Sequence, residues 1–269
     1  MKIIIKKNKL FKLIQNERNL GFVPTMGAIH LGHISLIKRS IKQCNNTLVS
    51  IFINKPQFNK KNDYIKYPRI IKQDISILKK INIDYLYLPS TKQIYPNKNK
   101  GNIKINNFSK RLCGRFRPGH FEAIADVIDR FIKIINPSKI YFGEKDMQQL
   151  IIISDFVKKK YPKIKILGCK TIREKNGIPY SSRNLLLTNN EKIIAANVYS
   201  ILRKNKKKIV KNKKKLNNLK RDIMGYGINK IDYIKILDIN KIIKPFKKVK
   251  KYKIFIAYYL GTTRLIDNI

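Results

Sequence analysis

The spacing of apolar and polar residues predicts strands and helices in alternation through the first two-thirds of the chain. Residues 20–25 form a short apolar run that ends in Pro24-Thr25-Met26-Gly27, and an amphipathic stretch follows at about residues 31–44. This order is typical of a strand, a glycine-containing turn and a helix. The pattern recurs, with further strands expected at residues 48–53, 85–88, 139–142 and 164–168 and further helices at 70–81, 121–135 and 150–157.

Strands that alternate with helices imply an α/β fold with a parallel, doubly wound sheet, whose ligands bind beyond the carboxyl ends of the strands. After about residue 172 the pattern changes. Helices are expected at about 189–209 and 214–224, and strand-like runs follow at 232–237 and 253–260. We therefore expect a second, smaller α+β domain, and 269 residues are enough for two domains.

The net charge of +44 at pH 7 comes from 60 Lys and Arg residues against 16 Asp and Glu. Such an excess usually indicates nucleic acid or an anionic membrane surface as a partner. The lysines, however, are spread over nearly every segment with many Ile and Asn, the residues that AT-rich codons favour, and Arg is not interleaved with aromatic residues for base stacking. We interpret the charge as compositional bias, with no specific nucleic-acid partner and a nonspecific attraction for small anionic ligands.

The basic run at residues 203–215 is the segment where a nucleic-acid patch is a real alternative. Four leucines and isoleucines near heptad spacing favour a solvated helix face with a buried side instead. They are Leu202, Ile209, Leu216 and Leu219. Residues 97–110 are rich in Asn, Lys and Gly and are expected to form an exposed loop.

No targeting segment or membrane span is predicted. The apolar run at residues 3–5 is too short for a signal-peptide core, and no run approaches the roughly 18 apolar residues of a membrane span. Cys44, Cys113 and Cys169 are far apart and form no Cys-x-x-Cys pair, so reduced thiols are expected rather than a disulfide framework or a zinc site. We expect a cytoplasmic protein.

The first candidate site is the segment from Thr25 to His33, at the junction of a predicted strand and helix. Free backbone N–H groups and the positive end of the helix dipole favour phosphate binding at such a junction. His30 and His33 lie on one helical face, and Gly27 and Gly32 permit close approach of a ligand. The alternative is a pair of capping or surface histidines.

Further candidates follow two other strands. The amides Asn54 and Gln57 can bind a polar substrate, although loop capping by Asn54 and a partly buried Gln57 is an equal alternative. In Gly143-Glu144-Lys145-Asp146 the lysine can meet phosphate oxygens, and Gln149 is expected to point toward the same crevice. The alternative for that segment is an acidic helix start.

Ser181-Ser182-Arg183-Asn184 lies between the two predicted domains. Hydroxyls and a guanidinium suit a loop that closes over a triphosphate, and helix capping by Ser or Asn is an alternative that can hold at the same time. Residues 111–121 add three arginines and the third histidine, His120, ahead of a helix. The sequence alone gives that segment no clear role.

Together these segments resemble the pantothenate synthetases, the pantoate and β-alanine ligases of the nucleotidyltransferase superfamily with HIGH-type motifs. The resemblance covers nearly the whole chain and rests on family-specific strings in the same order. They are GFVPTMG at residues 21–27, YPR at 67–69, RPGHF at 117–121, YFGEKD at 141–146 and LGTTRLIDN at 260–268.

The resemblance implies a homodimer. Each subunit would have a Rossmann-like domain for nucleotide and pantoate, residues 1–173, and a C-terminal lid domain that closes over the site, residues 174–269. (R)-Pantoate and ATP would give pantoyl-adenylate and diphosphate, and β-alanine would then displace AMP to form pantothenate, a coenzyme A precursor. The implied ATP contacts are Met26, Gly27, Ala28, Ile29, His30, Leu31, Gly32, His33, Gly143, Glu144, Lys145, Asp146, Ile172, Tyr180, Ser181, Ser182 and Arg183.

The resemblance also implies that Gln57, Gln149 and Asn54 bind the substrates, with Gln57 near both pantoate and β-alanine, and it puts a proton donor at His33. The chemistry favours a different role for this histidine, because the pantoate carboxylate is already ionised and needs no base. Charge develops instead on phosphate oxygens and on the leaving diphosphate. We expect the catalytic residues His33, His30, Lys145 and Arg183 to stabilise that charge together with Mg²⁺ carried by ATP.

The chain departs from the family pattern at several positions. Leu31 stands where Glu is usual, Phe116 replaces a small residue and Tyr180 replaces Met or Leu, and none of these changes removes a proposed catalytic group. Lys55-Pro56 replaces the usual Pro-Thr or Pro-Met order, so the loop that presents Gln57, and with it pantoate affinity, is expected to differ.

Three rival functions remain open. Another adenylyl- or cytidylyltransferase of the superfamily would share the histidine motif but not the amides Gln57 and Gln149. A basic nucleic-acid-binding protein that keeps an enzyme fold would bind in a steeply salt-dependent way. A decayed enzyme is disfavoured by the intact ATP-site residues.

Overall fold

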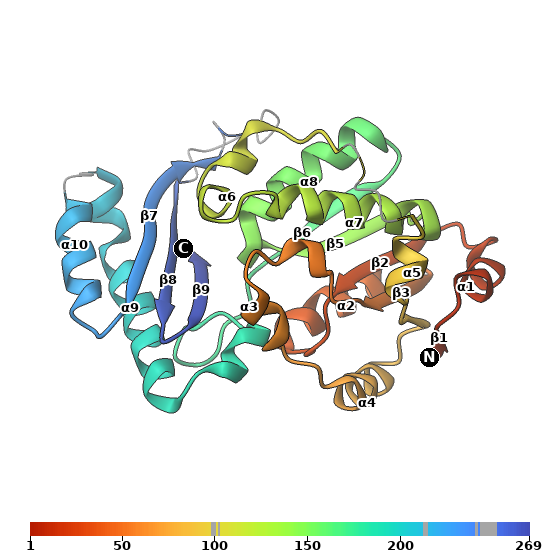
Figure 1. Cartoon of the computed structure of the whole chain (residues 1–269), viewed down its shortest axis with the longest axis horizontal. Coiled ribbons are helices and arrows are strands. Elements are labelled where there is room, and N and C mark those ends of the chain that lie inside the picture. The colour runs from red at the N-terminus through yellow and green to blue at the C-terminus, as the bar shows by residue number, and fades with distance from the viewer. Residues whose placement is uncertain (98–100, 102, 212–214, 240–241, 243–251) are drawn as a thin grey trace.

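The larger part of the molecule is a six-stranded parallel sheet, as the computed structural model shows for residues 1–97, 101, 103–211, 215–239, 242 and 252–269 (Figure 1). The strand order is β1-β4-β3-β2-β5-β6, and each neighbouring pair is parallel. The strands are β1 Lys2–Ile4, β2 Leu20–Thr25, β3 Asn46–Ile51, β4 Tyr85–Tyr87, β5 Lys139–Gly143 and β6 Lys165–Cys169. The predicted α/β class is therefore confirmed.

Helices cover both faces of this sheet because successive strand residues point to opposite sides. Phe22 and Ile140 belong to a core shared with α1, α7 and α8, whereas their neighbours Val23 and Tyr141 belong to a core shared with α2 and α4. Both faces of the strands are thus apolar, as expected for a doubly wound parallel sheet. The helices are α1 Lys7–Ile14, α2 Leu31–Gln43, α4 Ile71–Ile81, α7 His120–Ile135 and α8 Met147–Lys160.

The C-terminal part is a smaller α+β unit, which confirms the predicted change of pattern. Its antiparallel sheet has the order β7-β8-β9, and two helices pack on one face of it through a second core. In Figure 1 this sheet stands between those helices and the larger part. The elements are α9 Asn189–Lys211, α10 Lys215–Met224, β7 Lys230–Asp238, β8 Tyr252–Leu260 and β9 Thr263–Asn268.

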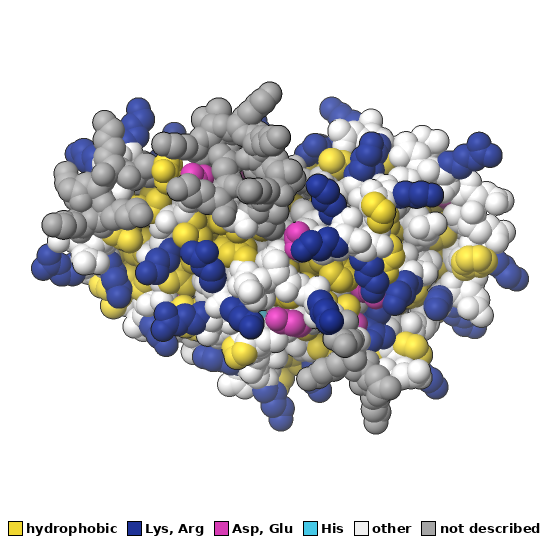
Figure 2. Space-filling model, turned by 90° about the horizontal axis from the view of Figure 1, so that it is seen from above, with side chains coloured by type: hydrophobic (Ala, Val, Ile, Leu, Met, Phe, Trp, Pro, Cys, Tyr) yellow, Lys and Arg dark blue, Asp and Glu magenta, His cyan; other side chains and the backbone are white. Residues whose placement is uncertain are grey.

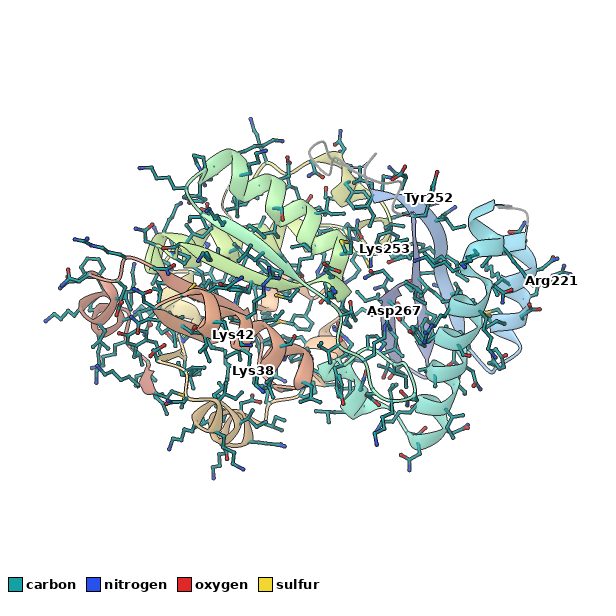
Figure 3. All side chains as sticks on the ribbon, turned by 180° about the vertical axis from the view of Figure 1, so that it is seen from behind. Lys38, Lys42, Arg221, Tyr252, Lys253 and Asp267 are labelled. Carbon is teal, nitrogen blue, oxygen red and sulfur yellow. The ribbon has the colours of Figure 1, made fainter. Side chains whose placement is uncertain are left out.

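The other face of the small sheet packs against the larger part. Tyr233 of β7 and Phe255 of β8 are buried in the same core as α7 and α8. Arg173, which follows β6, donates two hydrogen bonds to the Asp267 carboxylate of β9, at 2.7 and 2.9 Å. Asp267 and Lys253 lie at this junction in Figure 3. The domain boundary between residues 173 and 174 stays a prediction, and the two parts share packing across it.

Short helical segments connect these elements. They are α3 Lys61–Ile65, α5 Thr91–Ile94, α6 Cys113–Phe116 and the 3₁₀ turns η1 Lys55–Gln57, η2 Asn107–Lys110, η3 Glu144–Asp146 and η4 Ser182–Leu186. The prediction of an exposed loop at 97–110 is wrong for Phe108 and Ser109, which η2 buries. Residues 98–100 and 102 of that loop lie outside the described residues.

The basic run that begins at residue 203 forms a solvated helix face, as expected. Arg203 and Lys204 are exposed, whereas Leu202, Ile209 and Leu219 are buried in the C-terminal core. Residues 212–214 of the run lie outside the described part of the chain. Over the described residues, no helix is long and apolar enough to cross a membrane.

Candidate active site

The candidate site lies where the strand order reverses. Strands β2 and β5 are neighbours, but α2 follows β2 on one face of the sheet and α8 follows β5 on the other. The chain therefore diverges between these strands and leaves a crevice at their carboxyl ends. A cavity of about 220 Å³ opens there.

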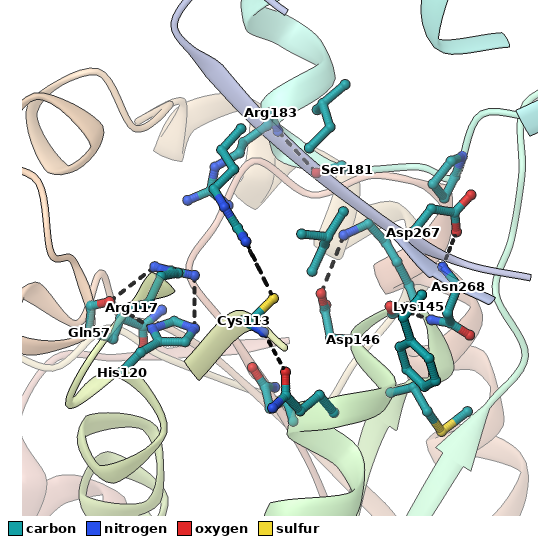
Figure 4. Close-up of a pocket in the computed structure, with 18 of the residues that line it drawn as sticks. Gln57, Cys113, Arg117, His120, Lys145, Asp146, Ser181, Arg183, Asp267 and Asn268 are labelled. Carbon is teal, nitrogen blue, oxygen red and sulfur yellow. Dashed lines mark hydrogen bonds and ion pairs between the residues drawn. The ribbon is translucent and has the colours of Figure 1, made fainter. Parts of the chain in front are cut away.

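Two cavities meet in this crevice. The second has a volume of about 160 Å³ and reaches toward the C-terminal part (Figure 4). The two share lining from four separate segments of the chain. The shared residues are Met26, Gln57, Lys145, Asp146, Gln149, Ser181 and Arg183.

The structure brings most of the sequence-predicted site residues to these cavities. Besides the shared residues, the larger cavity is lined by His30, Gly32, His33, Asn54, Gly143, Ile172, Tyr180 and Ser182. The remaining candidates do not line either cavity, and they are Gly27, Ala28, Ile29, Leu31 and Glu144. Leu31 is half-exposed.

His30 and His33 lie at the start of α2. His30 is the N-cap residue, and its Nδ1 accepts a long hydrogen bond of 3.4 Å from the backbone N–H of His33. The two rings are stacked with their centroids 3.9 Å apart. The capping alternative therefore holds for His30, while both rings also face the cavity.

Both histidines are neutral at pH 7. Burial, together with the nearby Lys145, lowers the pKa of His30 to about 4. Burial and the neighbouring His30 hold the pKa of His33 well below its usual value. The Nδ1 atom of His33 is buried and has no hydrogen-bond partner among the described residues. A buried polar atom without a partner is uncommon in a folded protein and marks His33 as a residue whose position needs a functional explanation.

The turn between β2 and α2 is held by Asp74, a residue of α4 that sequence reasoning missed. Its carboxylate accepts hydrogen bonds from the N–H groups of Ala28 at 2.9 Å and Ile29 at 2.7 Å. Burial raises the pKa of this carboxyl group. These two N–H groups therefore have partners within the protein. The N–H groups of Leu31 and Gly32 in the first turn of α2 have no partner among the described residues.

The two glycines of this motif have structural reasons of their own. Gly27 has a φ of +82°, and a Cβ there would lie 2.9 Å from an Asp74 oxygen. A Cβ at Gly32 would lie 2.9 Å from the capping ring of His30. Close approach of a ligand is therefore not needed to explain either glycine.

The amides behind β3 have different roles. Asn54 is buried, and its side chain donates to the backbone oxygen of Ala123 at 3.1 Å and to Gln57 Oε1 at 3.3 Å, and accepts from the Tyr95 hydroxyl at 2.8 Å. Its polar atoms are thus used within the protein. Gln57 Nε2 contacts the Met26 sulfur at 2.9 Å, so the amide of Gln57 is fixed in the wall of both cavities.

Lys145 enters the crevice from η3, directly after β5. Its ammonium lies 3.3 Å from the Asp146 carboxylate. Asn268 of β9 donates to the backbone oxygens of Glu144 at 2.8 Å and of Lys145 at 2.7 Å. The C-terminal part therefore fixes the turn that carries Lys145.

The serine–arginine segment forms η4 and touches the turn after β2. Ser181 caps η4 by accepting from the Arg183 N–H, so the predicted capping role is confirmed. Ser182 Oγ lies 3.2 Å from the backbone oxygen of Ala28. Arg183 is paired with both carboxylate oxygens of Asp63, at 2.9 and 3.0 Å.

The segment to which the sequence gave no clear role also reaches the site. Arg117 donates to His120 Nε2 at 2.8 Å and to the Gln57 backbone oxygen at 3.1 Å. His120 Nδ1 lies 2.8 Å from the same oxygen. Since an arginine only donates, His120 Nε2 accepts and its Nδ1 carries the proton. Burial and Arg117 hold the pKa of His120 well below its usual value, in agreement with a neutral ring.

A preformed metal cage is not found in the part of the chain that the structure describes. No group of three or more His, Cys, Asp or Glu side chains there could hold an ion. Mg²⁺ typically takes one or two carboxylates together with substrate phosphates. Asp146, which lines both cavities beside Lys145, is a carboxylate suited to this. These residues fit a metal that arrives on a nucleotide.

Comparison with known proteins agrees with this geometry. Residues 2–269 match the pantoate–β-alanine ligase family. The chain belongs to this family. Pantothenate synthetases from Clostridium botulinum and Caldicellulosiruptor saccharolyticus are 39% and 38% identical, and each alignment covers 100% of this chain and 95% of the relative.

Solved structures of pantoate–β-alanine ligases have the same fold. The ligase from Francisella tularensis, complexed with beta-gamma ATP and beta-alanine, is 37% identical with a TM-score of 0.85, and the match covers 100% of this chain and 97% of that one. Pantothenate synthetase from Thermus thermophilus is 27% identical with a TM-score of 0.91, over 100% and 99% of the two chains. The smaller C-terminal unit is therefore part of the family's architecture.

Proposed function

We propose that this chain catalyses the ATP-dependent condensation of (R)-pantoate with β-alanine, through a pantoyl-adenylate, and releases AMP and diphosphate. The observation that carries the proposal is the pair of cavities that meet at Gln57 and Lys145, beside the His30–His33 helix start. The complex of the Francisella tularensis ligase with beta-gamma ATP and beta-alanine supports it.

The larger cavity would hold ATP and pantoate. His30, His33, Lys145 and Arg183 come from the turns after β2 and β5 and from η4, so donors surround the space where phosphates would lie. Met26, Gly32, Gly143, Asp146, Ile172 and the segment 180–182 complete the proposed nucleotide site. Gln57 and Gln149 would hold pantoate, and Asn54 would act by orienting Gln57, because its own polar atoms are already bonded.

In the first step a pantoate carboxylate oxygen attacks the α-phosphorus of ATP. The bond from that phosphorus to the bridging oxygen breaks, and diphosphate leaves with the electron pair. His30 and His33 are neutral at pH 7, so they stabilise the developing charge as N–H donors, while Lys145 and Arg183 supply positive charge. Removal of one such donor typically lowers the rate by about a hundredfold or more.

In the second step the amine of β-alanine attacks the acyl carbon of the adenylate. The C–O bond to AMP breaks, AMP leaves as an anion, and the nitrogen loses one proton to solvent and keeps the other as the amide N–H. Mg²⁺ on the ATP phosphates would neutralise charge in the first step. Asp146, whose carboxylate lies beside the Lys145 ammonium, is the protein carboxylate that would contact this metal.

We further propose a cytoplasmic homodimer, which the unpaired cysteines and the family membership support.

The proposal is tested by incubating the purified protein with ATP, Mg²⁺, pantoate and β-alanine while AMP is followed. AMP should form only when pantoate is present, and pantothenate should accumulate with β-alanine. AMP formation that is absent, or indifferent to pantoate, would sink the proposal. In the same assay His33→Ala should lower turnover about a hundredfold with little change in Tm, whereas an equal loss of folding would favour a purely structural histidine.

A further inference from the structure

The smaller cavity contains positively charged side chains that are not among the proposed ATP and pantoate contacts, those of Arg117 and Arg264. It lies beyond Gln57, on the side that faces the C-terminal part, and three guanidinium groups line it (Figure 4). They come from Arg117 ahead of α7, Arg183 of η4 and Arg264 of β9. Such convergence of like charges in a partly buried space is costly unless an anion compensates it.

Two of the three guanidinium groups already have carboxylate partners. Arg183 pairs with Asp63 at 2.9 Å, and Arg264 pairs with Asp232 at 2.8 Å. The acidic residues of the cavity wall are used in the same way, since Asp267 pairs with Arg173 and Asp146 with Lys145.

Arg117 differs from the other two arginines. Its guanidinium contacts only a neutral ring and a backbone oxygen, those of His120 and Gln57, and no ion pair with a carboxylate is found for it among the described residues. Three of its five N–H groups therefore have no described partner. Burial and the neighbouring Arg183 and Arg264 lower the pKa of Arg117 to about 10. A site for one further anion is thus left at this guanidinium.

Arg117 is held in position by Gln57, which borders both cavities. Arg117 and His120 both bind the backbone oxygen of Gln57, whose side chain faces the space proposed for pantoate. An anion on Arg117 would therefore lie in the cavity that adjoins the proposed pantoate space, with Gln57 between the two. A planar guanidinium binds a carboxylate with two parallel hydrogen bonds.

We propose that Arg117, oriented by His120 and Gln57, forms the subsite for the carboxylate of the attacking amino acid, with Arg264 as a second positive charge. The inference rests on the proposed function and names the group that selects β-alanine over a simple amine. The cationic wall also favours the neutral form of the amine, which is the form that attacks the adenylate.

The test compares Arg117→Met with Arg115→Met, an exposed arginine two residues away. β-Alanine is compared with β-alaninamide, which keeps the amine and lacks the carboxylate. Arg117→Met should lower kcat/KM for β-alanine about thirtyfold, as expected when a buried charged partner is removed, and leave kcat/KM for β-alaninamide within about twofold. Arg115→Met should behave as the wild type with both amines. Equal losses for the two amines in Arg117→Met would overturn the subsite.

Propionate, which has the carboxylate and no amine, gives a second readout. It should compete with β-alanine in the wild type and lose most of its inhibition in Arg117→Met. Arg117→Lys keeps the positive charge but loses the two parallel N–H donors of the guanidinium. Its inhibition by propionate should fall between those of the wild type and Arg117→Met, and it replaces Arg117→Met in the test if that variant does not fold.

The pantoate-dependent exchange of labelled diphosphate into ATP needs no amine and separates this proposal from the proposed function. Exchange in the wild type is required by the function, and its absence would defeat the function itself. A raised KM for ATP in Arg117→Met, with an unchanged preference for β-alanine, would instead assign the guanidinium to the phosphates and overturn the subsite.

Discussion

The turn after β2 depends on one buried carboxylate more than on its glycines. Ala28 has a φ of +50°, which is uncommon for a residue with a side chain, and such a conformation persists only when its surroundings hold it. Asp74 binds the turn from α4, and Ser182 Oγ contacts the turn's carbonyl oxygens from η4. Together they fix the approach of the chain to His30.

Asp74→Asn should therefore destabilise the protein although it removes a buried charge. Asn offers one oxygen acceptor for two N–H groups, so one N–H is left unpaired and the amide faces another donor. We expect a loss of about 1–3 kcal/mol in the free energy of unfolding, measured by urea titration, and a lower turnover. Gln73→Ala, an exposed change on the same helix, should alter neither. Wild-type stability in Asp74→Asn would contradict the role of the carboxylate in the turn.

The three histidines should make the free energy of unfolding depend on pH below about 6.5. The pKa of His30 is lowered to about 4, and burial holds the pKa values of His33 and His120 well below the usual range. An unfolded histidine has a pKa of about 6.5, so below that pH the unfolded chain binds protons that the folded chain does not. Stability is therefore complete above pH 6.5 and falls as the pH is lowered.

Each histidine should contribute a loss of about 1 kcal/mol between pH 7 and pH 5.5, or about 3 kcal/mol together. Urea unfolding at the two pH values measures this difference. His120→Gln should remove about one-third of it, because each ring contributes separately. Equal stability at the two pH values would show that the rings take up protons as readily in the folded protein as in the unfolded chain.

At the scale of elements, regular amphipathic patterns were predictable and short or polar ones were not. The main strands and helices were predicted to within a few residues, as for α4, expected at residues 70–81 and found at Ile71–Ile81. β1 consists of only three residues, Lys2–Ile4, too few to give a period. β9 was missed because its buried positions include the polar side chains of Thr263, Asp267 and Asn268, which interrupt an apolar stripe. Asp267 and Asn268 bond across the junction instead.

The same distinction applies to the candidate site. His30 and Lys145 could be brought together from sequence, because turns after parallel strands meet at one edge of the sheet. Asp74 could not be found, since nothing near it in sequence shows that α4 packs on the turn after β2. The contact between Arg117 and Gln57 likewise depends on packing between segments 60 residues apart.

β9 links the C-terminal part to the proposed active site through Asn268. This side chain is buried and donates to the carbonyl oxygens of Glu144 and Lys145, the turn that carries the proposed phosphate-binding lysine. Asn268→Ala should therefore raise KM for ATP about tenfold or more, since a displaced Lys145 loses a charged contact worth about 1.5–3 kcal/mol. Thr262→Ala, at an exposed position just before β9, is the matched control. If Asn268→Ala loses stability but keeps the wild-type KM for ATP, Asn268 stabilises the fold and does not position Lys145.

At the scale of the whole molecule, the excess charge is a property of the surface and not of the site. Lys and Arg side chains are scattered over the face seen in Figure 2 with few acidic ones between them, and Lys38 and Lys42 continue the pattern along α2 in Figure 3. In the site, by contrast, Lys145, Arg183 and Arg264 each have a carboxylate partner. On the surface that the structure describes, only a few lysines, such as Lys133 and Lys159, pair with a carboxylate. The excess of unmatched lysines is in keeping with compositional bias over a specific nucleic-acid patch.

An excess of 60 basic over 16 acidic residues makes the folded chain repel itself, and salt should relieve this. We expect Tm to rise by about 5 °C between 10 and 200 mM NaCl, which corresponds to about 2 kcal/mol for a chain of this size. Screening is nearly complete once the Debye length falls below about 8 Å, so the rise should flatten above roughly 0.2 M. A Tm that climbs steadily up to 1 M would indicate a general effect of salt on apolar burial instead. A Tm that does not change at all would mean that the lysines are far enough apart for water alone to screen them.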